Sequence, residues 1–292
     1  MRFKSLNILW KKRLDPSRRK AVFTEYDKQR GYQRYHQYCQ SVVTRKFSPK
    51  DDMLSTQGLE HITVFDEPTS ATTLGSLLAK SEGSIQKENI DYSEMLQVND
   101  DIFLRQMFQN IFTPSIDHKL LHYFKSEYFV YWFAIFHTIP SPQSRRSFLW
   151  HCDKGPSRHL KILLYLNDTA VHGGNTEFFD REFTRKFSES GYLFGPVDAR
   201  QSDLSDLAKK LDLPYQPKKW SMHAGDAIIF EPSQILHRGI LPNHGSRYVL
   251  TLCLLPSPIP WHTAFDLTKG VGISQNYNWH TNARDIQQYF NS

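Results

Sequence analysis

The sequence is poor in cysteine and has no long hydrophobic run. Its 292 residues include only three cysteines, Cys39, Cys152 and Cys253, which lie far apart and form no CxxC pair. This spacing argues against a disulfide framework and favours a reducing compartment, so we expect a cytoplasmic protein. No apolar stretch approaches the roughly 20 residues that cross a membrane as a helix. The chain has 39% hydrophobic and 14% aromatic residues, which is the composition of a soluble globular protein.

The positive charge of the chain is concentrated at one end. The net charge is +6, but residues 1–34 hold eleven Lys or Arg against three Asp or Glu, so the remainder sums to −2. We expect this arm to be a basic helix that packs on the domain by its apolar side. The alternatives are contact with an anionic membrane surface and docking of an anionic partner. Because the excess charge lies in the arm, a nucleic-acid substrate is disfavoured. Nothing in the sequence indicates the oligomeric state.

The pattern of apolar residues changes near residue 128. Residues 1–95 predict a basic arm followed by helices and loops, with irregular connections over 55–84, and residues 96–127 predict a helical segment. Beyond them, eight short β-prone runs are separated by turn residues, at 129–136, 147–150, 160–166, 175–179, 220–223, 227–230, 235–238 and 248–255. This order predicts a mainly β protein with supporting α, in which a double-stranded β-helix (jelly roll) is buttressed by N-terminal helices.

Three parts follow from this pattern. Residues 1–95 are the arm and support, and residues 96–260 are the jelly-roll core. Residues 261–292 are a C-terminal extension that packs on the core. Within the core, the polar interval 180–219 predicts an inserted loop with a short helix near 203–211.

A histidine and an aspartate two residues apart are the strongest chemical signal. His151 and Asp153 end a strand-like run, and side chains at i and i+2 of a strand point to the same face. With His237, far downstream, they would form a set of two histidines and one carboxylate, which holds non-haem Fe(II) and leaves positions open. Cys152 would point to the opposite face and pack rather than bind metal.

Five motifs around this pair resemble the Fe(II)/2-oxoglutarate-dependent oxygenases of the phytanoyl-CoA hydroxylase and prolyl hydroxylase type. They cover roughly residues 128–256, in the family's order. They are Trp-His151-Cys-Asp153, Tyr165-Leu-Asn, Gly173-Gly174-Asn-Thr-Glu-Phe-Phe, Gly225-Asp226-Ala-Ile-Ile-Phe followed by His237-Arg-Gly, and Arg247-Tyr-Val-Leu-Thr251.

The resemblance implies a role for each of these residues. It implies that His151, Asp153 and His237 bind Fe(II) and that the co-substrate 2-oxoglutarate and O2 take the open positions. Arg247 would bind the distal carboxylate of 2-oxoglutarate, because a guanidinium can grip a carboxylate through two parallel hydrogen bonds. Tyr165 and Thr251 would add hydroxyls to the same carboxylate. Ascorbate is a candidate reductant.

The implied activity is hydroxylation of an unactivated C–H bond. The carboxylate of Asp153 favours hydroxylation over halogenation, whereas desaturation and ring formation share the same ligands. The leading hypothesis is an enzyme acting on a small molecule or a lipid- or carbohydrate-linked substrate. The alternatives are a protein or peptide hydroxylase, and a jelly-roll protein that binds metal or senses without turnover. Arg158, His159 and Lys161 are expected to be solvated, and the alternative is that they form a cationic rim near the metal.

Overall fold

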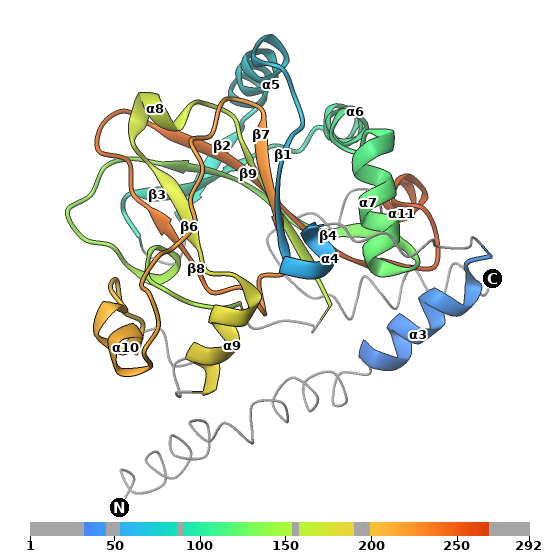
Figure 1. Ribbon diagram of the computed structural model, residues 1–292. Helices are drawn as coiled ribbons and strands as arrows, with labels where there is room; N and C mark the ends of the chain where they lie inside the picture. Colours follow the sequence, from blue (N-terminus) through green and yellow to red (C-terminus); the bar gives the residue numbers. More distant parts are fainter. Residues whose placement is uncertain (1–31, 45–52, 87–89, 154–157, 190–198, 269–292) are drawn as a thin grey trace, which may run out of the picture.

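A computed structural model describes residues 32–44, 53–86, 90–153, 158–189 and 199–268 (Figure 1). Most of the basic arm, residues 1–31, lies outside them, so its predicted packing or membrane contact stays a prediction. Among the described residues, no helix combines the length and the apolar character needed to cross a membrane.

The core is a seven-stranded antiparallel sheet. Its strand order is β1-β7-β5-β9-β4-β3-β2. The two longest strands pair at its centre. The strands are β1 (Leu59–Thr63), β2 (Gly83–Gln86), β3 (Ser93–Gln97), β4 (Glu127–Thr138), β5 (Leu160–Tyr165), β7 (Asp226–Phe230) and β9 (Arg247–Ser257).

Side chains alternate between the two faces of the large sheet, so each face packs against a different layer. Leu160, Ile162 and Leu164 of β5 lie on the outer face of the sheet, which the helices cover. They join the largest hydrophobic cluster, which includes Leu252 of β9 and Phe108. The helices of this layer are α6 (Asp101–Ile111), α7 (Pro114–Phe124) and α11 (Trp261–Thr268). Figure 1 shows these three helices gathered on one side of the sheet. The other face of the sheet is turned toward the second, smaller sheet.

The second sheet is short and irregular. It pairs β6 (Asn175–Phe178) with β8 (His237–Ile240), in the register Phe178↔His237. Isolated bridges extend it on both sides, His151↔His237 next to β8 and Phe178↔Lys218 next to β6. The two sheets enclose a cluster that includes Tyr165, Phe178 and Phe230. This arrangement agrees with the predicted jelly roll buttressed by helices.

Several predicted elements differ in the structure. Residues 59–97 were expected to be helices and loops, but they supply β1, β2 and β3, which extend the large sheet at both edges. The interval 55–84, expected to be irregular, also holds α5 (Glu67–Ala79), whose N-terminus is capped by the Asp66 carboxylate accepting from the Thr69 N–H.

The predicted helical segment 96–127 is two helices. Thr113 caps α7, and Pro114 follows as its first residue, so the chain breaks between α6 and α7. The remaining helices are α3 (Tyr32–Val42), α4 (Met53–Gln57), α8 (Thr169–His172), α9 (Arg181–Glu189) and α10 (Ser205–Lys210). The last of these agrees with the short helix expected near 203–211.

Two predicted strands are not strands. Residues 147 and 148 belong to a 3-10 turn, η1 (Arg146–Phe148), which begins at a residue with φ of 55°, and residues 149–150 form a bend after it. Residues 220–223 form a loop, because the Met222 carbonyl and N–H bond to the backbone and hydroxyl of Thr169 instead of to a neighbouring strand. The chain therefore reaches His151 from a turn rather than along a regular strand.

Candidate functional site

The two predicted histidines are tied together by their backbones. The His151 N–H donates to the His237 carbonyl at 3.0 Å, and the His237 N–H donates to the His151 carbonyl at 2.9 Å. This reciprocal bridge sets the two imidazole rings 4.3 Å apart, centroid to centroid. Two side chains that lie 86 residues apart in sequence thus meet at the edge of the small sheet.

Each imidazole is oriented by a second backbone contact. Nδ1 of His151 lies 2.7 Å from the Leu149 carbonyl, and Nδ1 of His237 lies 2.8 Å from the Ile235 carbonyl. A carbonyl only accepts, so Nδ1 carries the proton in both rings and Nε2 keeps its lone pair. Burial lowers the pKa of both histidines, and for His237 the neighbouring His151 adds to the effect. Both rings are therefore neutral donors of the kind that metals bind.

Asp153 completes the cluster. Its Oδ1 lies 3.4 Å from Nε2 of His151 and 3.9 Å from Nε2 of His237. The ligand atoms of the three residues lie within 4.8 Å of one another. No second cluster of potential metal ligands is found in the described part of the chain. Two neutral nitrogens and one carboxylate oxygen at this spacing can hold one divalent metal ion.

The carboxylate of Asp153 has a further partner, which the sequence offered only as an alternative. Lys161 forms an ion pair with Oδ2 of Asp153, and its side chain is only 15% exposed. Burial alone would raise the pKa of Asp153, but the Lys161 ammonium and the two imidazoles outweigh it and hold the pKa well below its usual range. The prediction that Lys161 and His159 are solvated is wrong, because both are buried or nearly so.

A buried arginine lies in the same pocket as the three potential ligands. Arg247 is 7% exposed and begins β9. Its Nη2 donates to the Thr176 hydroxyl at 3.0 Å and to the Tyr165 hydroxyl at 3.2 Å. Its Nε is buried and has no hydrogen-bond partner among the described residues. A buried guanidinium with an unused N–H is a site for an anion that the structure does not itself supply.

A pair of glycines precedes the strand beside this arginine, and the second of them makes room for it. Gly173 ends α8 with φ of 74°, a conformation that favours glycine. A Cβ on Gly174 would lie 3.0 Å from Cδ of Arg247, so a larger residue would press on the arginine side chain. The predicted Gly-Gly turn is therefore also the place where the chain passes close to Arg247.

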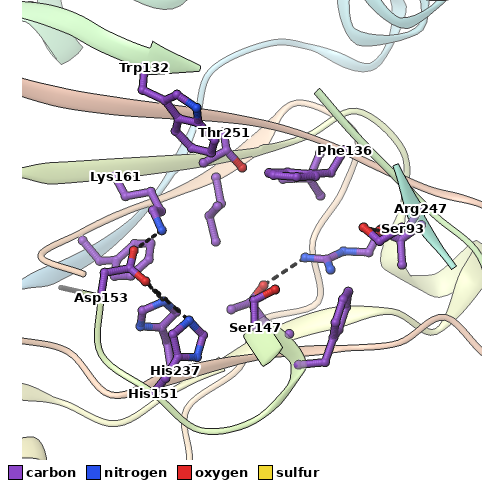
Figure 2. Close-up of a pocket in the computed structure, with 17 residues that line it drawn as sticks. Ser93, Trp132, Phe136, Ser147, His151, Asp153, Lys161, His237, Arg247 and Thr251 are labelled. Carbon is purple, nitrogen blue, oxygen red and sulfur yellow. Dashed lines mark hydrogen bonds and ion pairs between the residues drawn. The ribbon is translucent and has the colours of Figure 1, made fainter. Parts of the chain in front are cut away.

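Figure 2 shows one pocket that contains the potential metal ligands and the buried arginine. His151, Asp153, Lys161 and His237 lie at one end, and Arg247 lies at the other. Trp132, Phe136 and Thr251 lie across the pocket from the histidines. Of the six residues proposed from the sequence, His151, Asp153, His237, Arg247 and Thr251 line this pocket. The other lining residues are Ser93, Trp132, Phe136, Thr138, Ser147, Phe148, Lys161, Leu163, Thr176, Phe230, Gly239 and Val249.

Tyr165 is the one proposed residue that lies behind the pocket wall. It is fully buried, and its hydroxyl donates to the Thr176 hydroxyl at 2.8 Å while accepting from Arg247. The Thr176 oxygen accepts from both residues, which leaves its own proton for an acceptor in the pocket. Thr176, which lies in the Gly-Gly-Asn-Thr motif, is thus better placed than Tyr165 to meet a ligand.

Among the comparisons with known proteins, the one with solved structures finds similar folds. No protein-family model matches the sequence, and no curated protein matches it. The solved structures that it resembles include the non-heme alpha ketoglutarate dependent epimerase SnoN from nogalamycin biosynthesis. One SnoN structure has a TM-score of 0.50 at 14% identity, covering 70% of this chain and 80% of SnoN.

A second SnoN structure, in complex with Fe3+, alpha ketoglutarate and nogalamycin RO, has a TM-score of 0.52 at 12% identity. It covers 70% of this chain and 81% of SnoN. A prolyl hydroxylase from Trichoplax adhaerens is also similar, with a TM-score of 0.43 at 15% identity, covering 77% of this chain and 92% of that one. At these identities the likeness to SnoN shows a shared fold. The chain therefore has the jelly-roll fold that its motifs predict.

Proposed function

We propose that the protein is an Fe(II)- and 2-oxoglutarate-dependent dioxygenase. The observation that carries the proposal is one pocket with a set of three metal-binding side chains at one end and a buried, incompletely bonded arginine at the other. A metal ion and a dicarboxylate need just these two groups, because one carboxylate end binds the metal and the other needs a cation. The shared fold with SnoN supports the proposal.

The donor set fits ferrous iron. His151 and His237 present Nε2 lone pairs, and Asp153 presents Oδ1 toward both. Two imidazoles and one carboxylate suit a borderline metal and leave three positions for other ligands. A zinc site of the structural kind would be closed by a fourth protein ligand, and the cluster has no fourth member among the described residues.

The arginine end fits the distal carboxylate of 2-oxoglutarate. The unused Nε–H of Arg247 can donate to that carboxylate. The Thr176 proton is available to the same group, and Tyr165 holds both donors in place. We assign Tyr165 a positioning role, acting through Arg247 and Thr176. Thr251 lines the pocket between the two ends, where its hydroxyl can reach the co-substrate.

The chain's own residues then act by binding and orientation. When bound, Fe(II) and 2-oxoglutarate supply an oxidation of a C–H bond by O2 that yields succinate and carbon dioxide. Arg247 fixes the orientation of the dicarboxylate, while Trp132, Phe136 and Phe230 form apolar walls that exclude water from the reacting centre. The carboxylate of Asp153 keeps its place in the ligand set, which favours hydroxylation of the substrate over halogenation.

We further propose a small-molecule or a lipid- or carbohydrate-linked substrate. The pocket combines aromatic walls, Trp132 and Phe136, with hydroxyls from Ser93, Thr138 and Ser147. Aromatic faces with a few polar groups suit a compact ligand that has both apolar and polar parts. SnoN, which shares the fold, was crystallised with nogalamycin RO.

The test is an anaerobic titration of metal-free protein with Fe(II) and then 2-oxoglutarate. We expect a visible metal-to-ligand charge-transfer band, which arises only when 2-oxoglutarate binds the iron. His237→Ala should abolish the band. His223→Ala is the matched control, because the His223 side chain is 79% exposed and does not line the pocket. An unchanged band in the His237 variant would overturn the ligand assignment.

A second measurement separates an enzyme from a binding protein. Succinate release is measured under air with a panel of small molecules, glycosides and acyl compounds, and with proline-containing peptides. Release stimulated by a small compound supports the substrate proposal, and stimulation by peptides alone contradicts it. A charge-transfer band without succinate under any of these conditions would favour the non-catalytic alternative.

A further inference from the structure

One lysine inside the pocket belongs neither to the three metal-binding side chains nor to the arginine end. Lys161 is on β5, in line with Leu163 and Tyr165 along the inner face of the large sheet. It lines the pocket and pairs with Asp153. Figure 2 shows its ammonium group directed at the carboxylate, on the side away from the two imidazoles. Its nitrogen also lies 6.0 Å from the centre of the Phe230 ring, at the outer range of a cation–π contact.

The contact divides the two oxygens of Asp153 between different partners. Lys161 meets Oδ2, whereas both imidazole Nε2 atoms are nearest to Oδ1. The Asp153 N–H also donates to the Pro232 carbonyl at 2.8 Å, which fixes the backbone beneath the carboxylate. With Oδ2 held, Asp153 offers one oxygen to a metal and cannot turn to offer two. A position that a second oxygen would take therefore stays open.

The lysine also changes the charge that a metal ion meets. Two neutral imidazoles and a carboxylate carry a formal charge of −1, and the Lys161 ammonium brings the group to zero. A fixed positive charge beside a metal favours the lower oxidation state, because the field of a nearby charge is weakly screened inside a protein. The partners of a metal's ligands tune the metal in this way at other sites.

We propose that Lys161 is a positioning residue of the metal site, which holds Asp153 as a one-oxygen ligand and keeps bound iron ferrous. The inference depends on the proposed function, since it concerns iron in the pocket. It assigns a role to a residue that belongs neither to the three metal-binding side chains nor to the arginine end. It also explains why an inner-face position of β5 carries a lysine among leucines.

Three substitutions separate the charge from the hydrogen bond. Lys161→Arg keeps both, Lys161→Gln keeps a donor without the charge, and Lys161→Met keeps neither. The matched control is Lys119→Met, because Lys119 also pairs with a carboxylate, Glu60, and lies outside the pocket. Circular dichroism of the metal-free proteins establishes that each variant is folded.

The readouts are the Fe(III)/Fe(II) reduction potential and the position of the charge-transfer band with 2-oxoglutarate. We expect Lys161→Gln and Lys161→Met to lower the potential, to oxidise faster in air and to move the band to longer wavelength. Lys161→Arg and Lys119→Met should match the wild type. If Lys161→Met does not fold, the comparison of the Gln and Arg variants carries the test.

Two failures can be told apart. A wild-type protein without any charge-transfer band contradicts the proposed function itself. A normal band in the wild type, with the same potential and the same wavelength in Lys161→Gln, overturns the role of Lys161 and leaves the function standing.

Discussion

The two sheets that enclose the pocket differ in regularity, and they supply different parts of the site. The large sheet is a continuous ladder of seven strands, and it presents Lys161 from β5 together with Arg247 and Thr251 from β9. The small sheet has two strands of four residues and isolated bridges, and it presents His151 and His237. The large, regular sheet carries the cationic side chains of the pocket, and the small, irregular sheet carries the metal-binding histidines.

The difference reflects what each group requires. Long side chains such as Arg247 and Lys161 can adjust their reach at the two ends of the pocket, so strand alternation alone places them well enough. Metal ligands must converge within a few ångströms. That precision comes from the reciprocal bridge between His151 and His237 and from the carbonyl contacts of their rings. We therefore expect variants of the two sheets to fail in different ways.

The largest effect should come from the arginine of the large sheet. Arg247→Ala should weaken binding of 2-oxoglutarate by about 4 kcal/mol, roughly a thousandfold, because the buried carboxylate would lose its charged partner. Iron binding should be spared, since the metal-binding side chains lie at the other end of the pocket. Arg247→Lys should fall between, as an ammonium lacks the planar fork. Isothermal titration of 2-oxoglutarate into each Zn(II)-loaded protein measures these affinities. Equal affinities in the wild type, Arg247→Ala and Arg247→Lys would refute the assignment.

A core variant of the large sheet should cost stability without changing the site. Leu252 is fully buried on the outward face of β9 and packs in the cluster shared with the helices. Leu252→Ala should lower the free energy of unfolding by about 3 kcal/mol through lost burial and a cavity. Urea unfolding measures this change. The charge-transfer band of the folded variant should keep its position, and a shifted band would show that the two layers are coupled.

His172, just before the strand β6 of the small sheet, should make the stability of the protein depend on pH. His172 ends α8, and its Nδ1 accepts from the Gly174 N–H at 3.0 Å. Burial, helped by the charge of Arg247, lowers the pKa of His172 from 6.5 to about 4. A histidine kept neutral by folding contributes stability above its unfolded pKa of 6.5, and that stability is lost as the pH falls toward 4.

His172→Asn removes the titrating group while an amide oxygen replaces Nδ1 as acceptor. Between pH 7 and pH 5 the wild type should lose about 2 kcal/mol more stability than this variant. Urea unfolding at the two pH values makes the comparison. Parallel losses in both proteins would mean that His172 titrates normally.

The smallest effect should come from the threonine of the large sheet. Thr251→Val keeps the shape of the side chain and removes its hydroxyl, which should cost about 1 kcal/mol of 2-oxoglutarate affinity. The loss is thus less than tenfold, far below that of Arg247→Ala. An unchanged affinity would mean that Thr251 only packs against the pocket.

The contrast between the sheets also explains what the sequence could predict. Arg247 and Thr251, four residues apart on one strand, were expected on the same face, and both line the pocket. His151 and Asp153 were expected to converge as strand neighbours. Their ligand atoms do lie close together, although a turn at Arg146 replaces most of the expected strand. Local periodicity was sufficient wherever a side chain needed only the right face.

Contacts between separate elements were not predictable. Lys161 was expected to be solvated, with a cationic rim near the metal as the alternative, and its spacing from Leu163 and Tyr165 places it on the inner face. The strand β1 has polar residues at Glu60, His61 and Thr63, without regular alternation, and it pairs with β7, more than 160 residues later. Neither the pairing of β1 with β7 nor the ion pair of Lys161 with Asp153 follows from local periodicity.

The most direct test of the central claim is a crystal structure of the protein grown without oxygen in the presence of Mn(II) and 2-oxoglutarate. We predict that the metal ion is bound by Nε2 of His151, Nε2 of His237 and Oδ1 of Asp153, with the far carboxylate of 2-oxoglutarate on Arg247. A metal ion bound elsewhere, or a 2-oxoglutarate that does not contact Arg247, would contradict the account.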